Sequence, residues 1–202
     1  MNSIGCKVAI MQNRNTNLND IYMSDRLQAQ LQQIDQYAMT CVVAPMGYGK
    51  TTAVNWFLGE RSKVPGTRVV RISIYSDSLA IFWRSAQSAF AHAGLDFLRQ
   101  YELPSDLQGV MLLMDDMNRA LAGTGPLYIF LDDYHLLRGP RCAHFLCKCA
   151  VQLPKNVHII IASRNHFLSQ AEITKLCSRV CVLGPKQLRL DKDDLAVYTP
   201  RS

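Results

Sequence analysis

The sequence predicts a three-layer α/β domain with a mainly parallel, five-stranded sheet. Apolar runs of strand length alternate with helical segments along the 202-residue chain, an order typical of α/β proteins. Several runs, such as residues 157–162, are apolar at every position, as strands covered by helices on both faces must be. A glycine-rich turn also joins the first run to a helix, the layout of a phosphate-binding α/β unit.

The predicted elements alternate in chain order. The runs expected as strands are residues 39–43, 68–74, 127–131, 157–162 and 180–183, and the helices are 26–36, 53–58, 79–92, 107–121, 140–152 and 168–177. Ser24 or Asp25 is expected to cap the first helix. Gly59 is expected to end the second helix, since glycine commonly follows the last helical residue.

Composition indicates an intracellular globular domain. The chain is 49% hydrophobic and has a net charge of +6, and no segment reaches the ~18 consecutive apolar residues of a membrane span. We therefore expect a cytoplasmic protein without a membrane partner. Its basic residues are scattered, which favours an ordinary basic surface over a nucleic-acid groove. The seven cysteines are odd in number and scattered, as is typical of a reducing compartment.

Residues 44–52, Ala-Pro-Met-Gly-Tyr-Gly-Lys-Thr-Thr, have the pattern of a P-loop, with Ala44 where the usual motif begins with glycine. In such a loop the main-chain N–H groups and the following helix N-terminus bind phosphates. Lys50 is expected to reach the β- and γ-phosphates, and the Thr51 hydroxyl to ligate Mg²⁺. The predicted nucleotide-binding residues are Pro45, Met46, Gly47, Tyr48, Gly49, Lys50, Thr51 and Thr52.

Two later strands are expected to complete this site. Asp132 and Asp133 follow the apolar run 127–131, and a carboxylate at that place is what a Mg²⁺ ion beside a P-loop requires. Asp132 would hold the metal and Asp133 would orient or polarise the attacking water. Arg164 follows the run 157–162, where a guanidinium could contact the γ-phosphate. The predicted catalytic residues are Asp132, Asp133, Lys50 and Arg164; an arginine at the surface is the alternative for the last.

One cysteine and histidine cluster suggests zinc. Cys142, His144, Cys147 and Cys149 lie close together in sequence, but their spacing is not the C-x2-C pairing of common zinc sites. On a helix, Cys142 and Cys149 would share one face and Cys147 would point elsewhere. We therefore expect these cysteines to pack as small apolar residues.

Several stretches in the same order resemble one family. Residues 44–52 resemble the P-loop of the STAND NTPases, and more narrowly that of the MalT-like, LuxR-family large ATP-binding transcriptional regulators. Residues 76–78 with Phe82 and Trp83, the Leu-Asp-Asp-Tyr-His stretch at 131–135 (Walker B) and Ile-Ala-Ser-Arg at 161–164 are similar to the family's segments. Residues 188–190 with Asp194 and Leu195 are similar to the start of the module that follows its ATPase core.

The resemblance implies an order for the sheet and roles for its residues. It places the strand before Arg164 between the P-loop strand and the strand before Asp132, which brings Arg164 to the γ-phosphate. It implies that residues 21–26, with Arg26, frame the adenine. It divides the chain into an N-terminal extension (1–20), a P-loop NTPase domain (21–184) and the truncated start of a following module (185–202). The implied cofactors are ATP or ADP and Mg²⁺.

The expected function is therefore an ATP-binding, slowly hydrolysing switch domain of a signal-responsive transcriptional regulator. ATP would favour self-association, and DNA would bind only through modules that this chain lacks. The absence of an Asn-Lys-x-Asp signature favours adenine over guanine. Two alternatives remain at this level. One is a small-molecule kinase with residues 138–141 in its lid, and the other is a scaffold module that binds nucleotide without hydrolysing it.

Overall fold

In the computed structural model, which describes residues 23–189, the chain forms one five-stranded parallel sheet. Its strands are β1 (Met39–Val43), β2 (Arg68–Ser73), β3 (Leu127–Asp132), β4 (Val157–Ser163) and β5 (Val180–Leu183). They lie in the order β2-β3-β4-β1-β5, and every neighbouring pair is parallel. This confirms the predicted sheet, including β4 between the strand that precedes the glycine loop and the strand that ends in Asp132.

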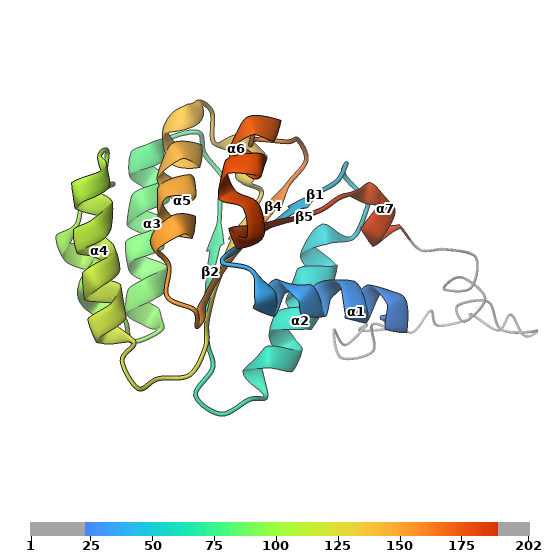
Figure 1. The fold of residues 1–202 in the computed structure, drawn as a ribbon, viewed down its shortest axis with the longest axis horizontal. Helices are drawn as coiled ribbons and strands as arrows, with labels where there is room; N and C mark the ends of the chain where they lie inside the picture. Colours follow the sequence, from blue (N-terminus) through green and yellow to red (C-terminus); the bar gives the residue numbers. More distant parts are fainter. Residues whose placement is uncertain (1–22, 190–202) are drawn as a thin grey trace, which may run out of the picture.

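Helices cover both faces of the sheet and make three layers (Figure 1). One face is covered by α1 (Asp25–Gln32) and α2 (Lys50–Ser62), and a short α7 (Pro185–Leu188) follows β5. The other face is covered by α3 (Leu79–His92), α4 (Leu107–Ala120), α5 (Pro140–Gln152) and α6 (Gln170–Leu176). No helix among residues 23–189 has the length and apolar character needed to cross a membrane.

The two faces of the sheet form two apolar cores. Along β1, Met39, Cys41 and Val43 belong to the core under α3 to α6, whereas Val42 belongs to the core under α1 and α2. All residues of β1 and β4 are buried, because alternate side chains point to opposite faces and both faces are covered. This is why these strands read as continuous apolar runs.

Most element boundaries follow the predicted signals. Ser24, Ser78 and Asp106 accept main-chain hydrogen bonds as N-caps of α1, α3 and α4. The predicted helix end at Gly59 is wrong, because α2 continues to Ser62. A glycine inside a helix costs only about 1 kcal/mol relative to alanine, and the buried Phe57 and Leu58 hold this part of the helix on the sheet.

Three strand ends differ from the prediction by one residue and α2 begins at Lys50; further differences lie at the ends of α1 and α6. Residues 33–36 form a 3-10 turn that follows α1. Ser169 caps α6 with Glu172 in a capping box, so that helix begins at Gln170 and not at Leu168. The helix ends at Leu176 and a 3-10 turn follows it. At the start of α6 the capping box sets the boundary, which apolar periodicity alone does not locate.

A polar network fixes α1 and α2 to the sheet. The Tyr128 hydroxyl donates to the Asp35 carboxylate at 2.8 Å, and Arg61 of α2 pairs with the same carboxylate. Burial, and then the hydrogen bond to Asp35, raises the pKa of Tyr128. The His158 ring stacks on Tyr128, and its Nδ1 donates to the Tyr37 carbonyl at 2.8 Å. The network therefore joins the turn after α1, helix α2 and strands β3 and β4.

Phe57 is the largest fully buried side chain of α2, so its truncation tests this core. It is 1% exposed and meets the Tyr128 ring edge-to-face at 5.6 Å. Phe57→Ala should lower the free energy of unfolding by about 3–5 kcal/mol, measured by urea denaturation. Val151→Ala, at a position that is 56% exposed, is the control and should change it by less than about 0.5 kcal/mol. Equal effects of the two substitutions would contradict this description of the core.

Candidate functional site

The parallel register brings three segments to one edge of the sheet. Val43 of β1 lies opposite Ser163 of β4, and Leu131 of β3 lies opposite Ile161. The Ala44 amide extends this pairing by donating to the Ser163 carbonyl at 3.2 Å. The glycine loop, Arg164 and Asp132 therefore leave the sheet side by side, at the carboxyl ends where ligands bind in open parallel sheets.

The glycine loop connects β1 to α2 through two left-handed residues. Gly47 has φ 86° and Gly49 has φ 70°, a region that residues with a Cβ rarely adopt. Gly49 is the residue before α2, and its carbonyl accepts the Ala53 amide at 2.8 Å. The N–H groups of the first helical turn have no partner inside a helix. The loop and this turn thus present main-chain donors beside the exposed Thr51 and Thr52.

Thr51 and Asp132, the two predicted metal ligands, lie together although 81 residues separate them. The Thr51 hydroxyl donates to Asp132 Oδ1 at 3.1 Å. The same carboxylate oxygen accepts the Asp133 amide at 2.9 Å, and Asp133 itself takes a left-handed φ of 55°. One hydroxyl and one carboxylate are the hard oxygen donors that Mg²⁺ takes from a protein. Metal binding by this pair stays a prediction.

Lys50 and Arg164 place two positive charges beside these acids. The Lys50 ammonium donates to the carbonyls of Ala44 at 2.7 Å and Pro45 at 3.0 Å. Burial and then the nearby Arg164 guanidinium lower the pKa of Lys50, while Asp133 and Asp132 act in the opposite direction. The four predicted catalytic residues are therefore close enough to share one electrostatic field, as the implied strand order requires.

His135 is a residue of this site to which the sequence analysis gave no role. Its side chain is 11% exposed, and Nδ1 lies 3.8 Å from Asp133 Oδ1. Burial and then Arg164 lower the pKa of the imidazole, which favours its neutral form. Tyr134 is buried against Phe167 instead. The signals in the sequence were its position two residues after Asp133 and its place in the Leu-Asp-Asp-Tyr-His stretch at 131–135.

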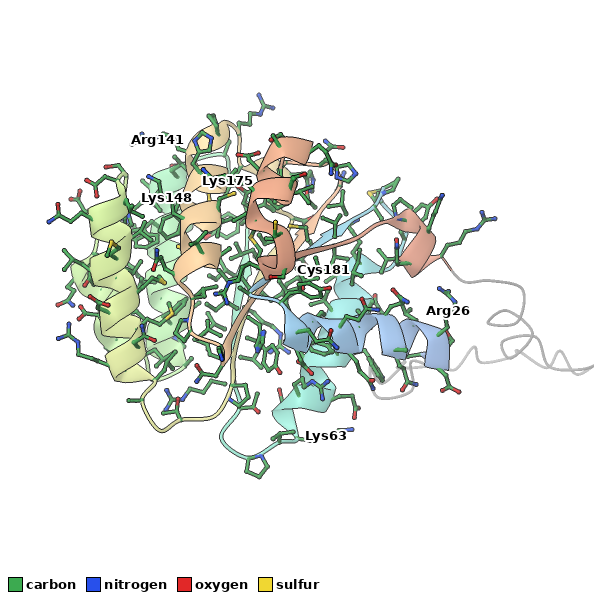
Figure 2. The ribbon with its side chains drawn as sticks, in the orientation of Figure 1. Arg26, Lys63, Arg141, Lys148, Lys175 and Cys181 are labelled. Atoms are coloured by element: carbon green, nitrogen blue, oxygen red, sulfur yellow. The ribbon has the colours of Figure 1, made fainter. Side chains whose placement is uncertain are left out.

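Arg26 joins the start of α1 to the segment after β5. Its guanidinium donates to the Gln187 carbonyl at 3.1 Å and to the Arg189 carbonyl, and Figure 2 shows it between α1 and α7. The contact ties the two segments that flank the P-loop unit in sequence, at the carboxyl end of β5. Residues 21 and 22, also predicted to frame the adenine, lie outside the described residues. The same holds for residues 1–20 and for the matched residues 190, 194 and 195.

The cysteine cluster on α5 is part of the core. Cys142 and Cys149 are buried, and Cys147 is half-buried. Burial raises the pKa of Cys142 and of Cys147 to about 11, so these side chains stay neutral thiols that pack as apolar groups. Within residues 23–189, no group of three or more His, Cys, Asp or Glu side chains is arranged to hold a metal ion.

The fold and the ends of its strands define the class of this domain. A five-stranded parallel sheet in the order β2-β3-β4-β1-β5, with a glycine loop after β1 and an acid at the end of β3, is that of a P-loop NTPase. The sequence is similar to the HTH-type transcriptional regulator MalT of two Klebsiella pneumoniae strains, with 27% identity over 185 residues. The described residues therefore form a MalT-like P-loop NTPase domain.

The alignment with MalT covers 87% of this chain and 20% of MalT, so the chain spans a fifth of the length of these curated relatives. No protein-family model matches the sequence. Among solved structures, Cdc6p from Pyrobaculum aerophilum is similar with a TM-score of 0.54 and 19% identity, over 82% of this chain and 48% of that one. Drosophila ORC bound to AT-rich DNA and Cdc6 has a TM-score of 0.50 and 14% identity, over 84% and 56%. At these identities the likeness concerns the fold alone.

Two glycines, Gly49 before α2 and Gly59 inside it, differ in backbone conformation. A Cβ would meet no atom within 4 Å at either Gly49 or Gly59, but only Gly49 has a positive φ. Gly49→Ala should lower the free energy of unfolding by about 1–2 kcal/mol, the cost of a left-handed L-residue. Gly59→Ala, inside α2, should raise it by about 0.5–1 kcal/mol. Urea denaturation of both variants checks this, and effects of the same sign would contradict the described loop.

Proposed function

We propose that this domain binds ATP with Mg²⁺ and acts as the nucleotide-dependent switch of a STAND-type, LuxR-family transcriptional regulator. The observation that carries the proposal is the contact between Thr51 and Asp132 at 3.1 Å, beside Lys50 and the glycine loop. A hydroxyl from the loop helix and a carboxylate from a separate strand converge where a P-loop would hold its metal. The similarity to a transcriptional regulator supports the regulatory role.

The charge balance of the site fits a polyphosphate. Burial and then the nearby Arg164 guanidinium lower the pKa of Lys50. An anion between them would remove this repulsion. The main-chain donors at Gly47 to Thr52 would bind the phosphates, with Met46 and Tyr48 at the exposed rim of the loop. Arg26 would hold the segments beside the base.

The residues have separate roles in this proposal. Thr51 and Asp132 would hold Mg²⁺, which would neutralise charge on the phosphates. Asp133, left-handed and exposed, would orient the attacking water or accept its proton. His135 Nδ1 lies 3.8 Å from Asp133 Oδ1, and the imidazole would limit the positions open to that carboxylate. Hydrolysis would be slow because Asp133 is the one acid in this proposal that orients the attacking water.

Arg164 would provide the discrimination on which a switch depends. It directly follows the central, fully buried strand β4, so its main chain is anchored at the edge of the sheet where the glycine loop also begins. A ligand shifts a conformational equilibrium only by its different affinity for the two states. Contacts of Arg164 and Lys50 with the γ-phosphate would be made with ATP and lost with ADP. We infer that ATP favours a self-associating state and that DNA binding resides in other modules of the regulator.

Removal of the Lys50 ammonium tests the nucleotide site. Lys50→Ala should weaken ATP binding at least about 30-fold, because a charged partner of the phosphates is lost. Isothermal titration calorimetry with ATP and Mg²⁺ measures the affinity. Lys63→Ala removes an exposed lysine that follows the same helix and should leave the affinity within about twofold. An unchanged affinity in Lys50→Ala would refute the proposed site.

Neutralising Asp132 tests the metal role separately. Asp132→Asn should cut Mg²⁺-dependent ATP hydrolysis by about 100-fold or more, and should make ATP binding insensitive to EDTA. Phosphate release and calorimetry with and without EDTA are the measurements. Asp115→Asn changes an exposed carboxylate of α4 and should behave as the unmodified protein. Turnover and EDTA response equal to those of the unmodified protein would remove Asp132 from its assigned role.

A further inference from the structure

A groove of about 670 Å³ lies beside β2, at the end of the sheet opposite β5. Figure 1 shows α3 alongside this strand. None of the lining residues belongs to the glycine loop, to Asp132 or to Arg164. Its lining comes mainly from β2 and from α3, and includes Val69, Arg71, Ser73, Arg84, Ser88 and His92. It is therefore a surface that the proposed nucleotide site does not use.

The floor of the groove is the open edge of the sheet. The amides of Arg68 and Ile74 donate to Pro126 and Asp132 on the β3 side, so even-numbered residues of β2 direct their main-chain groups inward. Val69, Arg71 and Ser73 alternate with them and direct their N–H and C=O groups outward. Since β2 pairs only with β3 among the described strands, these groups form a template for one more strand.

The groove has two polar walls. On one side, α3 contributes Arg84, Ser88 and His92. On the other side lie the side chains of Arg71 and Ser73, which point to the same face as Val69 because strand side chains alternate, and Val69 packs on the α1 and α2 core. Alternate side chains of a strand bound in the groove would therefore meet one wall and then the other.

The charge of the groove selects its occupant. Both walls carry an exposed arginine, Arg71 on the strand and Arg84 on the helix. Its described lining includes no acidic side chain. Near the carboxyl end of β2, the Tyr75 hydroxyl lies 3.2 Å from Ser85 Oγ, which marks one end of the groove. A segment with acidic side chains on both of its faces would match both walls.

A protective role for Arg71 alone does not account for both walls. A charged residue on an edge strand commonly prevents strand addition, but such protection needs no second arginine from the neighbouring helix. Pairing of β2 with β2 of a second copy is also disfavoured. It would bring the arginines of two copies together across the edge, and like charges on neighbouring strands are destabilising.

We propose that the β2 edge binds an extended, acidic segment of a partner protein as a sixth strand of the sheet. Main-chain hydrogen bonds to Val69, Arg71 and Ser73 would hold the segment, in the manner of β-strand addition. Arg71 and Arg84 would select its carboxylates. About five or six residues would span the edge, at ~3.3 Å per residue. The proposal does not depend on nucleotide binding.

Labelled peptides test the proposal directly. The probe is a fluorescein-labelled eight-residue peptide in which Glu-Glu pairs alternate with Thr-Thr pairs, so that both faces of the bound strand carry acids. It is titrated with the intact protein and followed by fluorescence anisotropy. One control peptide carries Gln for every Glu. Two further control peptides keep the acids but carry N-methyl groups on alternate amides. One is methylated at the odd-numbered amides and the other at the even-numbered amides, so that strand hydrogen bonds are blocked in either register. We expect the first peptide to bind, and each control to bind at least about tenfold more weakly.

Variants of the protein locate the binding. Arg71→Glu and Arg84→Glu should each weaken binding of the acidic peptide at least about tenfold. Arg99→Glu, on the exposed turn that follows α3, is the control of equal charge change and should have a much smaller effect. Circular dichroism confirms that each variant is folded. If a variant is unfolded, Arg71→Gln and Arg84→Gln replace it and should weaken binding in the same direction.

Amide exchange separates strand addition from simple charge attraction. Saturation with the acidic peptide should slow hydrogen exchange at Val69, Arg71 and Ser73 at least about tenfold, with little change at Val70 and Ile72, which already bond to β3.

Four outcomes would overturn the proposal. The first is that the acidic peptide shows no binding at concentrations up to about 1 mM, and the second is that the Gln or an N-methylated peptide binds equally well. The third is unchanged hydrogen exchange at the amides of Val69, Arg71 and Ser73. The fourth is self-association of the protein that Arg71→Glu abolishes. The last outcome would assign the edge to a second copy of this chain.

Discussion

The register of β4 between β1 and β3 is the constraint on which the rest of this structure depends. Val43 pairs with Ser163, and Leu131 pairs with Ile161, so strands β1, β4 and β3 end at nearly the same level of the sheet. A slip of one residue would turn every side chain of a strand to the opposite face. It would move the fully buried Ile160 and Ile161 each into the opposite core, and a slip in only one of the two pairings would separate Thr51 from Asp132. The apolar cores on both faces thus fix the position of the polar site.

Opposite charges at this edge are close enough to govern one another. Burial and then Arg164 lower the pKa of the Lys50 ammonium, and Asp133 and Asp132 oppose this shift. Burial and then the same arginine lower the pKa of His135. Such a balance is sensitive to any added anion or cation. In such a site a bound cation would meet the Asp132 and Asp133 carboxylates, and a bound polyphosphate would meet Lys50 and Arg164.

Sequence patterns predicted the fold well because its local and long-range demands agree. Continuous apolar runs gave β1 and β5 their observed ends, and the glycine loop located the site. The order of the strands came only from resemblance to a family, since periodicity does not say which strands are neighbours. The Arg26 contact joins residues 161 positions apart, and no local pattern encodes it. The end of α2 was missed because packing of Phe57 and Leu58 outweighs the weak helix propensity of Gly59.

The edge groove and the predicted site share one structural element, which limits how they can interact. Ser73 lies opposite Asp132 in the β2–β3 register, and the Ile74 amide donates to the Asp132 carbonyl at 3.0 Å. A strand added outside β2 would therefore be separated from the Asp132 carboxylate by β2 alone. Proximity by itself does not couple two sites; coupling requires that each ligand distinguish the same two states. If nucleotide binding moves the end of β3, the outer edge of the neighbouring strand β2 would move with it. A segment bound at that edge would then favour one nucleotide state.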